Sequence, residues 1–172
     1  PADVMEPLLR DACLYGLTLV ARLGGASLLD PSDPALCLAC CEALLAPEPR
    51  TRWYAAAFWQ CVCVWPEHAA ALTRTVVALS AARSAGVVVG GDAEGAQQLT
   101  SGLAVMRALA DSAEPELALA AAGAVANVLQ HDSLAPLWTD APRRQSYLLG
   151  VGEAERVRLL GRPAELAKQD SE

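Results

Sequence analysis

The chain has 172 residues, of which 53% are hydrophobic and 19% charged, and this balance excludes intrinsic disorder over most of its length. Aromatic residues make up only 5%, and the apolar residues are mainly Ala and Leu, so the composition favours helices over sheets. The net charge of −7 disfavours nucleic acid as the main ligand, because basic side chains on phosphate supply most of that affinity.

The first predicted helix begins near Asp3, which can cap it, and ends at about Leu23, before two consecutive glycines. Six of its apolar residues lie at helical spacing: Leu8, Leu9, Cys13, Leu17, Val20 and Leu23. A turn rich in Pro and Asp at residues 30–34 then introduces a second helix over about residues 34–45.

One segment occurs twice, 66 positions apart, as Pro47–Ala57 and Ala113–Gly123. Each copy has an acidic residue, then Pro, then about 15 residues with hardly a charge. Pro is tolerated in the first turn of a helix, where its missing N–H would be unpaired anyway. The copies therefore predict helices over about residues 49–64 and 115–130. Both are shorter than the roughly 20 residues of a membrane span, and we expect them in the protein interior.

Between these copies the sequence predicts two more helices, one from Pro66 to about Ser84 and one from about Ala93 to Ala110. Their inward residues are expected to be Leu72, Val76, Val77, Leu79, Leu99, Leu103, Met106 and Leu109. The glycine-rich stretch at residues 86–95 lacks the spacing and the Lys of a phosphate-binding loop. We interpret it as an insertion between helical units.

A last helix is predicted from Pro142 to about Leu160. Five arginines gather near it: Arg143, Arg144, Arg156, Arg158 and Arg162. They fit a solvated end cap, although an Arg-rich helix can also meet an acidic peptide or phosphate. Six or seven helices with short connectors and no convincing strand predict an all-α fold. We expect one domain over residues 1–162 and a polar tail over residues 163–172.

A repeat pattern is visible around the second Pro-led helix. A helix ending at Leu109 is followed by an Asp-containing turn, and the next helix carries Ala124-Val125-Ala126-Asn127-Val128. These features resemble the armadillo/HEAT class of helical repeats, and residues 36–64 resemble a more degenerate copy in which Cys61 stands where Asn127 stands. The resemblance implies an α-solenoid of about three repeats that serves as a protein-interaction scaffold.

In peptide-binding armadillo proteins, an inner-helix Asn holds the ligand backbone and a Trp one turn earlier packs beside it. The corresponding Trp places hold Gly123 and Ala57 here, so the resemblance implies a general scaffold and not that particular binding mode. The expected function is therefore non-catalytic binding of a protein or peptide segment along the inner helices. The alternative is a helical subunit of an obligate oligomer or larger complex.

The residues expected to bind the partner are Asn127, Gln60, Trp53 and Arg107. Asn127 is the only Asn in the chain, and a buried Asn without partners costs about 1–3 kcal/mol. It either bridges to a neighbouring loop or faces a groove and holds a ligand. In the second case, alanine at this position should weaken binding and leave thermal stability nearly unchanged.

The cysteines and histidines are the remaining candidates for chemistry. Cys37, Cys40, Cys41, Cys61 and Cys63 offer enough thiolates for zinc, but they lie in apolar helical segments, where Cys behaves as a small hydrophobe. His68 and His131 lie near helix ends and are interpreted as surface or capping residues. We expect no metal, no cofactor, no nucleic acid and no membrane partner. Without a visible secretion signal, the expected location is cytoplasmic, with nuclear as an alternative.

Overall fold

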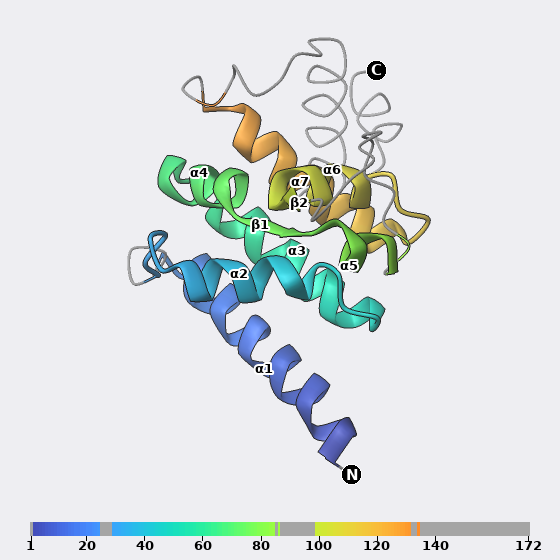
Figure 1. Ribbon diagram of the computed structural model, residues 1–172. Helices are drawn as coiled ribbons and strands as arrows, with labels where there is room; N and C mark the ends of the chain where they lie inside the picture. The colour runs from blue at the N-terminus through green and yellow to red at the C-terminus, as the bar shows by residue number, and fades with distance from the viewer. Residues whose placement is uncertain (1, 25–28, 85, 87–98, 132–133, 135–172) are drawn as a thin grey trace, which may run out of the picture.

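The computed structural model describes residues 2–24, 29–84, 86, 99–131 and 134. Helices dominate this part of the chain, as predicted, and a short two-stranded sheet joins them (Figure 1). In chain order the elements are α1 (Ala2–Arg22), α2 (Pro34–Ala43), α3 (Pro49–Val62), α4 (Pro66–Arg74), β1 (Val76–Ala78), α5 (Leu79–Ser84), β2 (Leu99–Ser101), α6 (Gly102–Leu109) and α7 (Pro115–Leu129). The predicted helix from Pro142, the arginine cluster and the polar tail lie outside the described residues.

The helix starts and stops follow local chemistry. The Asp33 carboxylate caps α2 by accepting hydrogen bonds from the backbone N–H groups of Ala35 at 2.9 Å and Leu36 at 3.2 Å. Helices α3, α4 and α7 each begin with Pro, and the two predicted helices that correspond to α3 and α7 are confirmed within two residues at their ends. Gly24 follows α1 with a φ of +84°, the left-handed conformation that commonly ends a helix.

The fourth and fifth predicted helices are wrong in part. A strand, β1, interrupts the first of them and pairs antiparallel with β2, with Val77 opposite Thr100. Thr75, Val76 and Val77 are β-branched in succession, and such residues fit a pleated strand better than a helix. The carbonyl of Thr75 also accepts the backbone N–H of Gly102 at 2.8 Å, which fixes the start of α6 beside the end of α4.

Most of the expected inward residues are buried. Leu72, Val77, Leu103, Met106 and Leu109 all belong to the core. Val76 and Leu99 are wrong: both are exposed, because they share one face of the short sheet while Val77 and Thr100 share the buried face.

Helix α3 is the centre of the core. Its most extensive contacts are with α7 and α1, and α2 and α4 pack against it as well. Trp59 and Val62 are 1% and 0% exposed, and Val125 of α7 is 0% exposed. The prediction that both apolar Pro-led helices lie in the interior is confirmed. Within the described segments, no helix combines the length and hydropathy that crossing a membrane requires.

Gly102 gives a test of how tightly these elements pack. A Cβ at this position would lie 2.6 Å from Cys41 Sγ and 2.9 Å from the Leu72 carbonyl oxygen. Gly102→Ala should lower the free energy of unfolding by about 1–3 kcal/mol in urea denaturation, because the core has no room for a methyl group. Adding Cys41→Ala should recover part of that loss. If Gly102→Ala is as stable as the parent chain, this packing is wrong.

Candidate functional site

The structure brings together two of the four residues expected to bind a partner. The Asn127 side-chain Nδ2 donates a hydrogen bond to the backbone carbonyl of Gln60 at 2.7 Å, which joins α7 to α3. Trp53 lies two turns before Gln60 on α3, where its ring is half-buried and 4.8 Å from the ring of Tyr54. Arg107 lies half-buried on α6. The Asn127 amide thus bridges within the fold, as the first alternative predicted, but its acceptor lies in a helix and not in a loop.

The Asn127 bond has a clear physical reason. Gln60 lies in the last turn of α3, where backbone carbonyls have no donor within their own helix. His131, four residues beyond Asn127, bonds the carbonyl of the residue that follows α3, with 2.9 Å between its Nε2 and the Cys63 oxygen. A carbonyl can only accept, so Nε2 carries the proton of that bond. Two side chains at the end of α7 therefore cap the end of α3.

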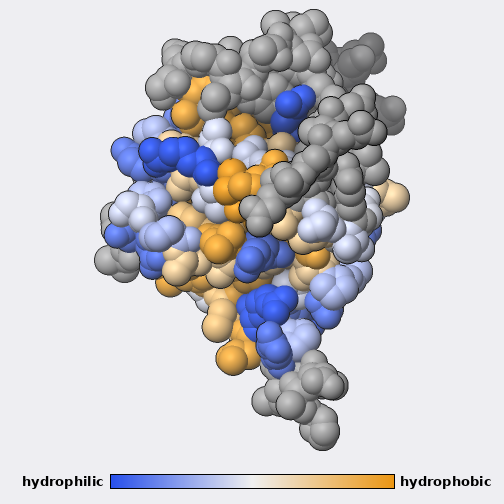
Figure 2. All heavy atoms as spheres, in the orientation of Figure 1, coloured by the Kyte–Doolittle hydropathy of each residue, from blue (hydrophilic) through white to orange (hydrophobic). Residues whose placement is uncertain are grey.

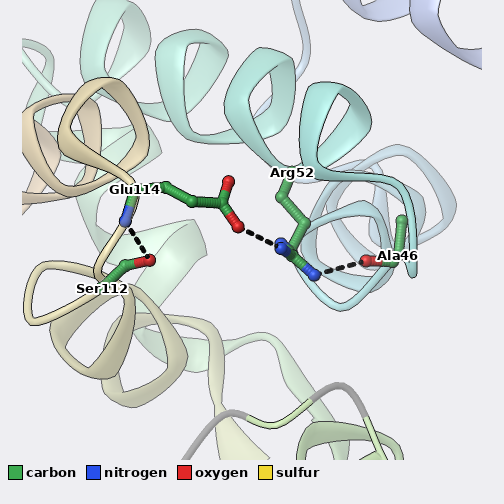
Figure 3. Close-up of polar contacts among 4 residues, drawn as sticks. All are labelled: Ala46, Arg52, Ser112 and Glu114. Carbon is green, nitrogen blue, oxygen red and sulfur yellow. Dashed lines mark hydrogen bonds and ion pairs between the residues drawn. The ribbon is translucent and has the colours of Figure 1, made fainter.

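A second set of polar contacts joins the beginnings of the same helices (Figure 3). Arg52 Nη2 lies 2.6 Å from Glu114 Oε1, and Arg52 Nη1 donates to the Ala46 carbonyl at 3.3 Å. The Ser112 hydroxyl oxygen accepts the Glu114 backbone N–H at 3.2 Å and holds the turn before α7. The N-terminal ends of α3 and α7 are joined to each other, and so are their C-terminal ends, so the two helices run parallel.

Helix α1 is held to α3 by one buried carboxylate. Asp11 is 9% exposed and accepts the Thr51 hydroxyl at 2.6 Å, and Arg50 Nε lies 3.6 Å from its second oxygen. The rings of Tyr15 and Tyr54 pack edge to face at 5.9 Å. Asp11, Leu14, Thr18 and Ala21 are buried, and their spacing places them on one side of the helix.

The opposite side of α1 is apolar and exposed. We call it the outer face of α1 and define it by these side chains: Leu8 (55% exposed), Leu9 (65%), Tyr15 (51%), Leu19 (39%), Val20 (37%) and Leu23 (86%). The stripe expected at helical spacing therefore points largely to solvent, whereas the polar Asp11 and Thr18 are buried. Figure 2 shows apolar side chains on the lower part of the molecule, where α1 runs in Figure 1.

The cysteines pack as small apolar groups. Cys37, Cys40, Cys41 and Cys63 are buried in the core. Burial raises the pKa of the Cys40 thiol to about 12 and also raises the pKa of Cys41 and Cys63, so these thiols are protonated and unreactive at neutral pH. In the part of the chain that the structure describes, no group of three or more His, Cys, Asp or Glu residues could hold a metal ion.

No protein-family model, curated protein or solved structure matches this chain. The armadillo/HEAT resemblance accordingly stays an expectation from the sequence. The outer face of α1 and the polar contacts between α3 and α7 are the features of the described structure that bear on function.

The Asn127 bond changes the expected effect of alanine at this position. Asn127→Ala leaves the Gln60 carbonyl without its donor and should lower the free energy of unfolding by about 1–3 kcal/mol. Gln130→Ala, which changes an exposed residue at the end of the same helix, is the matched control and should be nearly neutral. Equal urea midpoints for the two variants would contradict the capping role.

The buried thiols predict how stability depends on pH. A thiol whose pKa is raised by folding contributes stability below its unfolded pKa, and this contribution is lost as the pH rises toward the folded value. From about pH 9 toward pH 12, the free energy of unfolding should fall less steeply for Cys40→Ala than for the parent chain. The difference should approach about 1.4 kcal/mol per pH unit. Identical slopes in denaturation at pH 8 to 10.5 would show that Cys40 ionises equally in both states.

Proposed function

We propose that the chain is a non-catalytic protein-interaction module that binds its partner through the outer face of α1. The observation that carries this proposal is the continuity of the exposed apolar side chains, from Leu8 at one end to Leu23 at the other. Single exposed apolar residues are ordinary on protein surfaces, but a contiguous apolar patch marks an interaction site.

The architecture we propose is an armadillo/HEAT-like array in which α3 and α7 are equivalent helices of successive units. Both begin with Pro after a glutamate, Glu48 or Glu114, and they pack parallel to each other. Stacked repeats place equivalent helices in this way. Helix α1 packs against α3 with one face only, as a helix at the edge of an array does.

The outer face of α1 is a better docking site than a groove along the inner helices. The Asn127 amide group, which would hold a ligand backbone in such a groove, donates to Gln60 instead. The Gln60 side chain lies against Gly123, where even an added Cβ would overlap it. Helices α3 and α7 use these polar groups for contacts with each other, whereas the aliphatic side chains of the outer face of α1 are exposed to solvent.

A non-catalytic role agrees with the state of the reactive side chains. His68 and His131 each use Nε2 on a backbone carbonyl, of Leu29 at 3.1 Å and of Cys63 at 2.9 Å. The buried thiols are protonated. We propose a protein partner and neither a nucleic acid nor a membrane, since the chain is acidic and the exposed face carries no basic cluster.

Charge introduced on the outer face tests the proposal. A photo-crosslinking residue at Leu23 should capture a protein from an extract of the cells that make this chain, with the crosslinks mapping to α1. Leu19→Glu should lower the capture at least tenfold, because a carboxylate would have to be buried in an apolar contact. Leu38→Glu on α2 is the matched control, with 38% exposure against 39% for Leu19. Equal capture by the two variants would overturn the proposal.

A further inference from the structure

We infer that the partner of the outer face of α1 is a second copy of this chain, packed antiparallel. The twofold axis crosses the outer face at the level of residue 14, between Ala12 and Gly16. The inference rests on the proposed function, because it names the occupant of the same surface. A twofold interface uses one patch on both copies, so the patch must be complementary to itself. The residues of α1 meet that condition.

The bulky residues are placed symmetrically about the centre. In an antiparallel pair centred on residue 14, Leu8 of one copy lies opposite Val20 of the other, and Leu9 lies opposite Leu19. All four side chains are exposed in the single chain. Each end of the face therefore offers two aliphatic side chains to the two at the opposite end of the second copy.

Small residues occupy the middle of the same face. Ala12 and Gly16 lie opposite each other in this register, between the two bulky ends. A Cβ added at Gly16 would meet nothing within 4 Å, so open space lies over this position. The distance between packed helix axes depends on the side chains at the contact, and small residues at the crossing let two helices approach closely.

The size of the face suits a dimer. Its exposed side chains present on the order of 500 Å² of apolar surface, near the upper range for the largest patch on a monomer. Complete coverage of this surface in both copies would bury about 1,000 Å², which is the lower limit for a specific interface.

The charged side chains beside the outer face and the position of α1 are compatible with a second copy. Glu6 and Arg10 are ion-paired at 3.2 Å along one flank of the face, so these two charges neutralise each other beside the proposed contact. The first polar contact between α1 and α3 is made by Asp11, and the helix before it extends away from the other elements (Figure 1). The N-terminal half of α1 is thus accessible from its outer side.

Sedimentation velocity over a range of protein concentrations tests the inference directly. The parent chain should be a dimer at micromolar concentration, and Leu9→Glu and Leu19→Glu should each weaken association at least tenfold. Leu38→Glu should dimerise like the parent chain. Leu9 precedes every described polar contact between α1 and α3, so its variant should keep the parent circular dichroism spectrum, and its melting temperature should no longer rise with protein concentration.

Disulfide crosslinking tests the antiparallel register, in a Cys13→Ser background that removes the exposed native thiol of α1. The double variant Ala12→Cys, Gly16→Cys should form a covalent dimer with a mild oxidant, because each new thiol faces the other type on the second copy. Ala12→Cys alone should crosslink weakly. If Ala12→Cys alone crosslinks as efficiently as the double variant, residue 12 faces residue 12 of the second copy. The pair is then parallel and the inference is overturned.

The outcomes separate this inference from the proposed function. A parent chain that is monomeric at all concentrations overturns the second copy as partner. If Leu19→Glu then still abolishes capture of a different protein at Leu23, the interaction function stands with another occupant. If Leu19→Glu changes neither association nor capture, both proposals fail.

Discussion

The parallel pairing of α3 with α7 is the constraint on which the rest of the structure depends. Both helices are nearly free of charge and hide their apolar side chains largely against each other and their neighbours. At the end of α3, Asn127 and His131 bond backbone carbonyls that would otherwise lack donors, and at the beginnings of the two helices Arg52 pairs with Glu114. Hydrophobic burial supplies the driving force for this pairing, and the capping bonds specify its direction.

The position of α1 follows from that pairing. With one side of α3 covered by α7, another side takes α1, and the Asp11 carboxylate bonded to Thr51 sets which face of α1 turns inward. A polar anchor on the inner side leaves aliphatic residues such as Leu9 and Leu23 on the outer side. The surface that we assign to a partner is therefore a consequence of how the helix is attached.

Local signals in the sequence were enough to predict α3 and α7, the start of α2 after the turn at residues 30–34, and the core residues of α6. Local signals did not predict the features that depend on contacts between residues far apart in the sequence. Strand β1 forms because residues more than twenty positions away pair with it, which no local pattern reveals. The inner face of α1 was missed because a buried Asp needs a hydroxyl on another helix. The Asn127 bond was foreseen as one of two alternatives, since polarity alone does not specify the acceptor.

Native-state hydrogen exchange is the most direct test of the central claim, that α3 and α7 form one cooperative unit. The amides of both helices should exchange only through global unfolding and should give the same opening free energy. In the monomeric Leu9→Glu variant, the amides of α1 before Asp11 should exchange faster than the amides of α3 and α7, since that half of the helix makes few contacts. Exchange of α7 at a clearly lower free energy than α3 would contradict the account, because the two helices could not then stabilise each other.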